Sequence, residues 1–98
     1  MLQFEMTGIV TKIDELKEGV SARTGAAWKR RAVVIMTEEE PGRGSVVLQL
    51  RNEEALNVTC HGVKLEENLP VKVHLTCRAV QNDKGFWSNE VWAWRIER

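Results

Sequence analysis

A basic cluster surrounds one tryptophan in the first half of the chain. Arg23 and the run Lys29-Arg30-Arg31 lie on either side of Trp28, and no acidic residue occurs between positions 19 and 37. The whole chain is neutral, with 14 Lys and Arg against 14 Asp and Glu, so this excess is local. Cations along the phosphates and a flat ring for a base are what a groove for single-stranded nucleic acid needs. The alternative is a solvated strand rim beside a tryptophan packed at the core edge.

Strand geometry divides this cluster between two faces. In an extended strand Trp28 and Arg30 share one face, and Lys29 and Arg31 share the other. One ligand could contact all four only if the strand is twisted there.

A second aromatic group follows a hairpin signal. The sequence Asn82-Asp83-Lys84-Gly85 predicts a tight turn, with Phe86 and Trp87 directly after it. We expect this turn to face the basic loop across a groove, with Trp87 opposite Trp28. The residues predicted to contact nucleic acid are Arg23, Trp28, Lys29, Arg30, Arg31, Arg51, Arg78, Lys84, Phe86 and Trp87.

Trp92 and Trp94 lie two positions apart, and hence on one face of the last strand, with Val91 and Ala93 on the other. We interpret both tryptophans as packing residues, either in the core or at a subunit contact. Four tryptophans in 98 residues are too many for the core alone. Some exposed aromatic surface is expected, which favours a binding module.

Metal binding and catalysis find little support. Cys60, His61, His74 and Cys77 include two ligand types, but His74 and Cys77 are three apart on one strand and point to opposite faces. No C-x-x-C occurs. Neither histidine has a nucleophile at a known motif, and no glycine pattern fits a phosphate loop. The acidic run at 38–40 is typical of a solvated turn. The sequence therefore predicts no metal, no cofactor and no enzyme activity.

Period-two alternation predicts five strands, at about residues 3–14, 28–37, 45–51, 71–80 and 86–97. The first changes its apolar phase near Gly8, where a bend or bulge is expected. Residues 17–27 read as a long loop and 38–44 as a turn. Residues 52–69 can hold a helix, with Asn52 as a plausible N-cap and Gly62 keeping the helix short.

Five strands with one short helix or irregular segment between the third and fourth predict an all-β fold, a five-stranded OB-fold Greek-key barrel filling a single domain, residues 1–98. A five-stranded SH3-like barrel is the main competitor. It has no natural place for the long segment before strand four.

Three stretches carry a family resemblance: "MTGIVTKIDE", "WKRRAVVIMTEE" and "KGFWSNEVWAWRIE". Together they resemble a small family of bacterial single-domain proteins similar to the OB-fold of bacterial single-stranded DNA-binding protein and its primosomal relatives. The resemblance implies binding of single-stranded DNA. One departure is Arg51-Asn52, where an aromatic-Gly pair is expected.

The composition limits where in the cell the protein is expected and how it could bind nucleic acid. No apolar run is long enough to cross a membrane, the first residues carry no secretory signal, and two cysteines without a signal indicate reduced thiols in a cytoplasm. Balanced charge argues against a protein that coats nucleic acid by charge alone.

We expect a homodimer or homotetramer that binds single-stranded DNA, with RNA as the alternative, in replication, repair or recombination. A protein-interaction OB module with an exposed tryptophan face, without nucleic-acid binding, is the second hypothesis.

Overall fold

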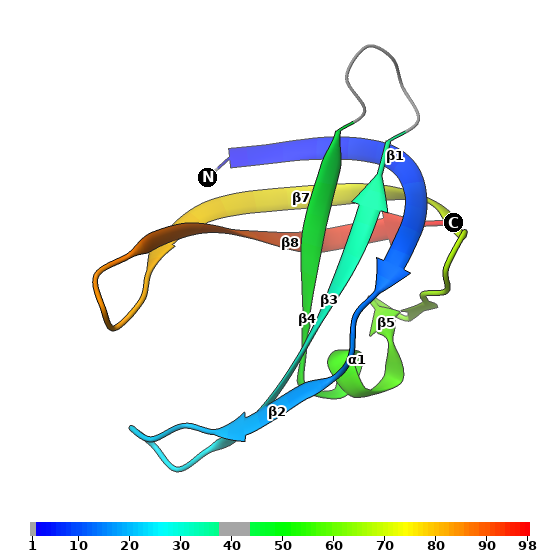
Figure 1. The fold of residues 1–98 in the computed structure, drawn as a ribbon. Coiled ribbons are helices and arrows are strands. Elements are labelled where there is room, and N and C mark those ends of the chain that lie inside the picture. The colour runs from blue at the N-terminus through cyan, green and yellow to red at the C-terminus, as the bar shows by residue number, and fades with distance from the viewer. Residues whose placement is uncertain (1, 38–43) are drawn as a thin grey trace.

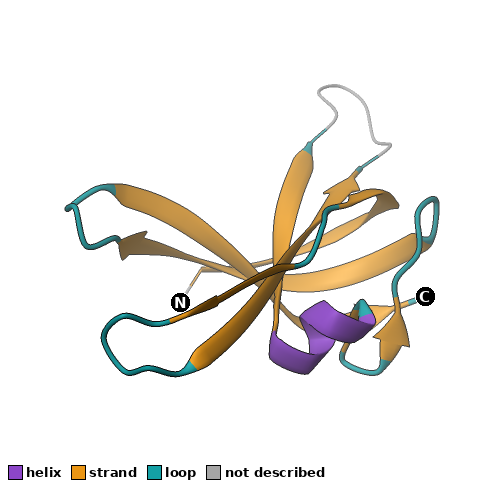
Figure 2. Cartoon of the chain, turned by 60° about the horizontal axis from the view of Figure 1, so that its bottom comes forward, coloured by secondary structure: helices purple, strands orange, loops and turns teal. Residues whose placement is uncertain are grey.

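The computed structural model describes residues 2–37 and 44–98, and within them the chain is mostly β-structure with one short helix (Figures 1 and 2). Its elements, in chain order, are β1 (Leu2–Ile13), β2 (Lys17–Val20), β3 (Ala27–Met36), β4 (Ser45–Arg51), α1 (Asn52–Asn57), β5 (Thr59–Cys60), β6 (Val63–Lys64), β7 (Pro70–Gln81) and β8 (Trp87–Glu97). The all-β prediction and the short helix between the third and fourth long strands are confirmed. The predicted turn at 38–44 lies almost entirely outside the described residues.

The five long strands close into a ring. The sheet order is β1-β7-β8-β4-β3-β2, and β1 also pairs with β3. All of these pairings are antiparallel except β4–β8, which is parallel and aligns Leu48 with Val91. The first half of β1 pairs with β7 and the second half with β3, so β1 is the strand that closes the ring.

Alternating apolar residues fill the ring. Its fully buried side chains come from β1, β3, β4 and β7, namely Val10, Val33, Ile35, Leu48, Leu50, Val71, Val73 and Leu75. The segment between β4 and β7 adds the buried Ala55, Cys60 and Leu65 to the same core. In Figure 1 α1 and β5 lie together at one end of the ring.

Two hairpins extend beyond the ring, as Figure 1 shows on its left side. One is β2–β3, in which Lys17–Val20 pairs with Arg30–Ala27. The other is the end of β7–β8, which closes through Gly85 at φ +86° as the sequence predicted. The expectation of a long loop over 17–27 is therefore wrong in its first part. A short edge strand with two charged residues and a glycine has no alternation to reveal it.

The change of face in β1 falls later than predicted. Met6, Gly8 and Val10 all point inward, and the register shifts between Val10 and Lys12, after which Ile13 packs against the core. Gly8 serves another purpose. A Cβ at Gly8 would overlap the carbonyl group of Met36, so glycine permits the close approach of two backbones where β1 passes from β7 to β3.

Helix α1 begins one residue earlier than predicted. Its N-cap is Arg51, without a side-chain cap hydrogen bond, and Asn52 has φ +56°. The helix ends where Val58 adopts a left-handed conformation, at φ +56°. Gly62 lies at φ +83° between β5 and β6. In the part of the chain that the structure describes, no helix has the length and apolar character needed to cross a membrane.

Replacing Gly8 by alanine should destabilise the ring. The added methyl group must displace the β3 backbone at Met36, which we expect to cost about 1–3 kcal/mol in the free energy of unfolding. Gly44→Ala is the matched control, because a Cβ there makes only an ordinary contact with the Thr37 methyl group. Denaturant unfolding measures both, and equal stabilities would contradict this role of Gly8.

Candidate nucleic-acid interface

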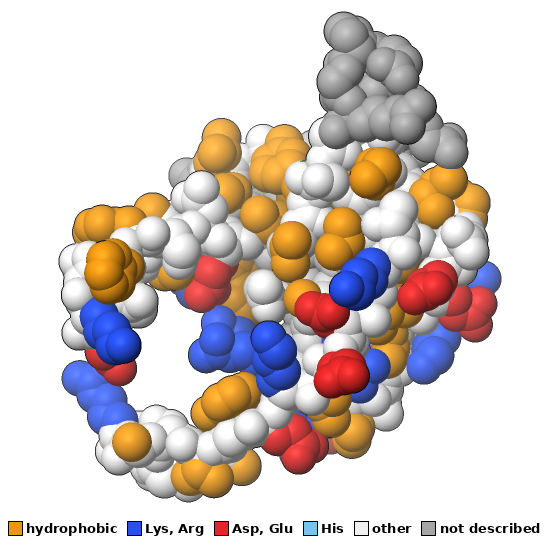
Figure 3. Space-filling model, viewed as in Figure 1, with side chains coloured by type: hydrophobic (Ala, Val, Ile, Leu, Met, Phe, Trp, Pro, Cys, Tyr) orange, Lys and Arg blue, Asp and Glu red, His pale blue; other side chains and the backbone are white. Residues whose placement is uncertain are grey.

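A cleft of about 630 Å³ separates the two projecting hairpins. Arg23 and its neighbours in the β2–β3 loop form one wall, Asp83 from the β7–β8 turn lies on the other, and Arg51 lies at the end of β4. The lining residues are Val20, Ser21, Ala22, Arg23, Trp28, Lys29, Arg30, Arg51, Asn52 and Asp83. Figure 3 shows Lys and Arg side chains gathered around the hollow between the hairpins. The sequence cluster therefore forms the lining of one cleft.

Cross-strand pairing fixes the Trp28 ring in this cleft. Trp28 pairs with Gly19 of β2, and a Cβ on Gly19 would overlap the ring. The Arg30 guanidinium lies 5.0 Å from the ring centroid, a cation–π distance. Trp28 and Arg30 thus share a face, as strand alternation predicts.

Arg51 continues the basic surface onto the next strands. It pairs with Arg30 across β3–β4, and its guanidinium lies 4.4 Å from the centroid of the Trp92 ring. Glu90 accepts hydrogen bonds from Arg51, at 3.4 Å, and from the Trp92 indole, at 3.1 Å. These contacts bring together residues of β3, β4 and β8.

A second cleft, of about 400 Å³, adjoins the first. It is lined by Arg51, Thr76, Cys77, Arg78 and Trp92. Arg51 lines both clefts, so the two sets of lining residues meet at this side chain. We call these residues the Arg23–Arg78 path: Arg23, Trp28, Lys29, Arg30, Arg51, Arg78 and Trp92.

Arg31 lies apart from this path. It pairs with the buried Leu50 and so lies on the inward face of β3. Its Nε is buried and has no hydrogen-bond partner among the described residues. It borders a small separate pocket with Asp14 and Gln49. Of the two residues expected on this face, the structure brings only Lys29 into the cleft.

The tip of the β7–β8 hairpin holds three predicted contacts, which do not line the cleft. Phe86 and Trp87 are each 68% exposed, and Lys84 precedes them in the turn. The Asn82 side chain accepts hydrogen bonds from the amides of Lys84 and Phe86, which fixes the turn. The cleft places Asp83, rather than Trp87, opposite Trp28.

A bulge in β8 places Trp94 on the outer surface. Ala93 pairs with Leu75 and Arg95 with His74, which leaves Trp94 without a partner on β7. Trp94 is 49% exposed and contacts the His74 ring at 5.0 Å. Trp92 is half-buried beside Arg51. Neither tryptophan lies in the core, so a subunit contact stays a prediction for both.

His74 is a buried polar residue on β7, only 8% exposed. Its Nε2 donates to Glu97 at 3.0 Å, and its Nδ1 lies 3.5 Å from a Glu5 carboxylate oxygen. The hydrogen bond from His74 lowers the pKa of Glu97 below its usual value. Trp94 covers the ring because of the bulge, which local sequence does not reveal.

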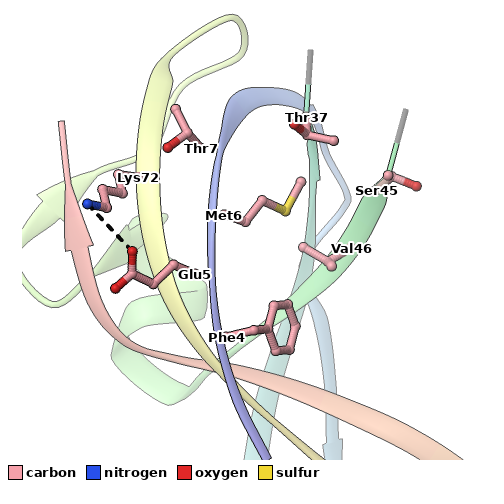
Figure 4. A pocket seen from close by; sticks show the side chains of 9 residues that line it. Phe4, Glu5, Met6, Thr7, Thr37, Ser45, Val46 and Lys72 are labelled. Carbon is pink, nitrogen blue, oxygen red and sulfur yellow. Dashed lines mark ion pairs between the residues drawn. The ribbon is translucent and has the colours of Figure 1, made fainter. Parts of the chain in front are cut away.

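A third groove, of about 480 Å³, lies between β1 and the ends of β3 and β4. Figure 4 shows Phe4, Met6 and Val46 directed into it, while Glu5 turns toward Lys72, with which it forms an ion pair of 3.6 Å. Because its one lysine is paired with Glu5 and apolar side chains point into it, this groove is a poor site for phosphates.

Sequence comparison places the chain in a family. Residues 5–97 match the model of a domain of unknown function, DUF3127. The chain belongs to this family. No curated protein matches it. The matched range includes both projecting hairpins and the whole Arg23–Arg78 path, so the candidate site lies inside the family's domain.

The two cysteines should differ sharply in reactivity. Burial raises the pKa of the Cys60 thiol to about 12, whereas Cys77 is half-buried and borders the second cleft. At mildly alkaline pH, a thiol-reactive chromophore should label Cys77 of the folded protein and leave Cys60 unmodified until unfolding. Cys77→Ser should remove the fast-reacting thiol. Rapid labelling of that variant would show that Cys60 is accessible.

Proposed function

We propose that the chain is an OB-fold module that binds single-stranded nucleic acid along the Arg23–Arg78 path. Its ring order, β1-β3-β4-β8-β7, with α1 between the third and fourth long strands, supports the OB-fold assignment. In that fold the surface of the second and third strands, with the first-second and fourth-fifth loops, binds oligonucleotides. Here those parts are β3, β4, the β2–β3 region and the turn at Asp83, which together line the larger cleft.

The observation that carries the proposal is the shared face of cations and tryptophans. Arg30 stacks on Trp28 and Arg51 stacks on Trp92, within two adjoining clefts. A groove of this kind supplies charges for a phosphate backbone and planar groups for bases. Among the described residues, Asp83, Glu90 and Glu18, which pairs with Lys29 across β2–β3, are acidic residues in or beside the path.

The resemblance to bacterial single-stranded DNA-binding and primosomal OB proteins supports single-stranded DNA as the ligand, with RNA as the alternative. A cytoplasmic role in replication, repair or recombination, and assembly into a homodimer or homotetramer, belong to the same proposal. With zero net charge, attraction acts at short range and affinity per domain should be modest.

Arg30→Ala should weaken binding of a fluorescent oligothymidylate, measured by anisotropy over a salt series. With about three to four phosphates neutralised, the wild-type logarithmic salt slope should be roughly −2 to −3, and loss of one contact should flatten it by about 0.7. Arg95→Ala is the matched control, because Arg95 lies outside both clefts and pairs with Glu97. Folded wild-type protein that binds no oligonucleotide at low salt would contradict the function.

A protein-interaction module is the second candidate, favoured by the exposure of Phe86 and Trp87 away from the cleft lining. Trp87→Ala separates the two functions. If a base stacks on this ring, the variant should lose about 1–3 kcal/mol of binding free energy with little sequence dependence. Unchanged affinity would assign the hairpin tip to another partner.

A further inference from the structure

The two arginine–tryptophan pairs of the path differ in charge balance. Arg30 forms no ion pair with any described residue, and Arg23 and Lys29 beside it in the cleft form none either. Arg51 instead lies 3.4 Å from Glu90. Among the described residues, the cations at the Arg23 end of the path thus form no ion pair, with Asp83 across the same cleft and Glu18 across β2–β3 from Lys29 as the nearby acids. At Arg51 the charge is balanced by Glu90.

The side chains of Arg51, Trp92 and Glu90 contact one another and hold the Arg51 guanidinium over the Trp92 ring. One carboxylate oxygen of Glu90 accepts from both the indole N–H and the guanidinium, and the guanidinium lies 4.4 Å from the Trp92 ring centroid. The Arg51 side chain is still 42% exposed, against 23% for Glu90. A planar group is thus held in place with part of its surface open to the clefts.

We propose that Arg51, Trp92 and Glu90 form a base-stacking subsite, and that the phosphates are bound by the cations on either side that form no ion pair with a described residue. This inference rests on the proposed function. Bases stack on guanidinium planes as well as on aromatic rings, whereas a phosphate at this position would meet the Glu90 carboxylate. Arg30 on β3 is a cation on one side of the subsite.

Arg78 supplies the cation on the other side. It pairs with Glu90 across β7–β8 but makes no ion pair with a described residue, and it lines the second cleft. A strand crossing the subsite would therefore meet a cation before and after the stacked base. Glu90 is a positioning residue in this arrangement, because it holds the Arg51 plane and offsets its charge.

The test compares an oligothymidylate with an abasic strand of equal length, which carries the same phosphates without bases. Arg51→Lys keeps the charge and loses the plane, so it should weaken oligothymidylate binding roughly tenfold and abasic binding less than about twofold. Arg30→Ala should weaken both strands by the same factor. Glu90→Gln, which frees the Arg51 charge, should steepen the salt slope by about 0.7. Thermal unfolding verifies that each variant is folded.

Each contrary outcome has a distinct meaning. If Arg51→Lys weakens both strands equally or neither strand, Arg51 is not a stacking platform, and the subsite is overturned while the binding function stands. The same holds if the wild type binds both strands equally tightly, because bases then contribute nothing. If the folded wild type binds neither strand, the proposed function and the subsite are both overturned.

Discussion

The pairing of β1 with two different strands closes the ring, and the rest of the structure depends on this closure. Leu2–Ile9 follows β7 and Ile9–Ile13 follows β3, with Gly8 at the close approach to Met36. Both β3 and β7 are longer than the stretch that β1 covers. Past the residues that pair with β1, β3 still pairs with β4 as far as Arg30, and its end pairs with β2, while the end of β7 pairs with β8. These two strand ends extend past the ring. The cleft exists because the β2–β3 and β7–β8 hairpins extend farther than β1, the strand that closes the core.

The same alternating pattern has opposite consequences inside and outside the ring. Along β7, Val71, Val73 and Leu75 are almost fully buried, whereas Cys77 is half-buried and Ala79 is exposed. Pairing with β1 ends at Cys77, which is where burial fades. Cys77 itself lines the second cleft, and Ala79 lies beyond it on the surface. At Cys77, strand length relative to the ring, rather than any special motif, turns a core position into a lining position.

Local alternation predicted the long strands, including the bounds Ser45–Arg51, and placed Trp28 and Arg30 on one face. It could not predict the register shift after Val10 or the bulge at Trp94, because a single extra residue reverses the faces without changing residue types. Local alternation also could not predict the contact between Arg51 and Trp92, for another reason. That contact depends on the parallel alignment of β4 with β8, a choice of partner strands that neither sequence segment contains.

Charge segregation, rather than net charge, decides how this neutral chain could hold an anion. On the outer surface near β1, Glu5 and Glu97 form ion pairs with Lys72 and Arg95, respectively, and both carboxylates contact the His74 ring. Those acids are satisfied locally and lie on other strands than Arg23, Lys29 and Arg30. At physiological salt a charge is screened within about 8–10 Å, so a ligand in the cleft responds to the cations that line it more than to the distant acids. Attraction of such short range acts only on a ligand that is already inside the cleft. The specificity for that ligand then depends on the shape of the cleft and on stacking.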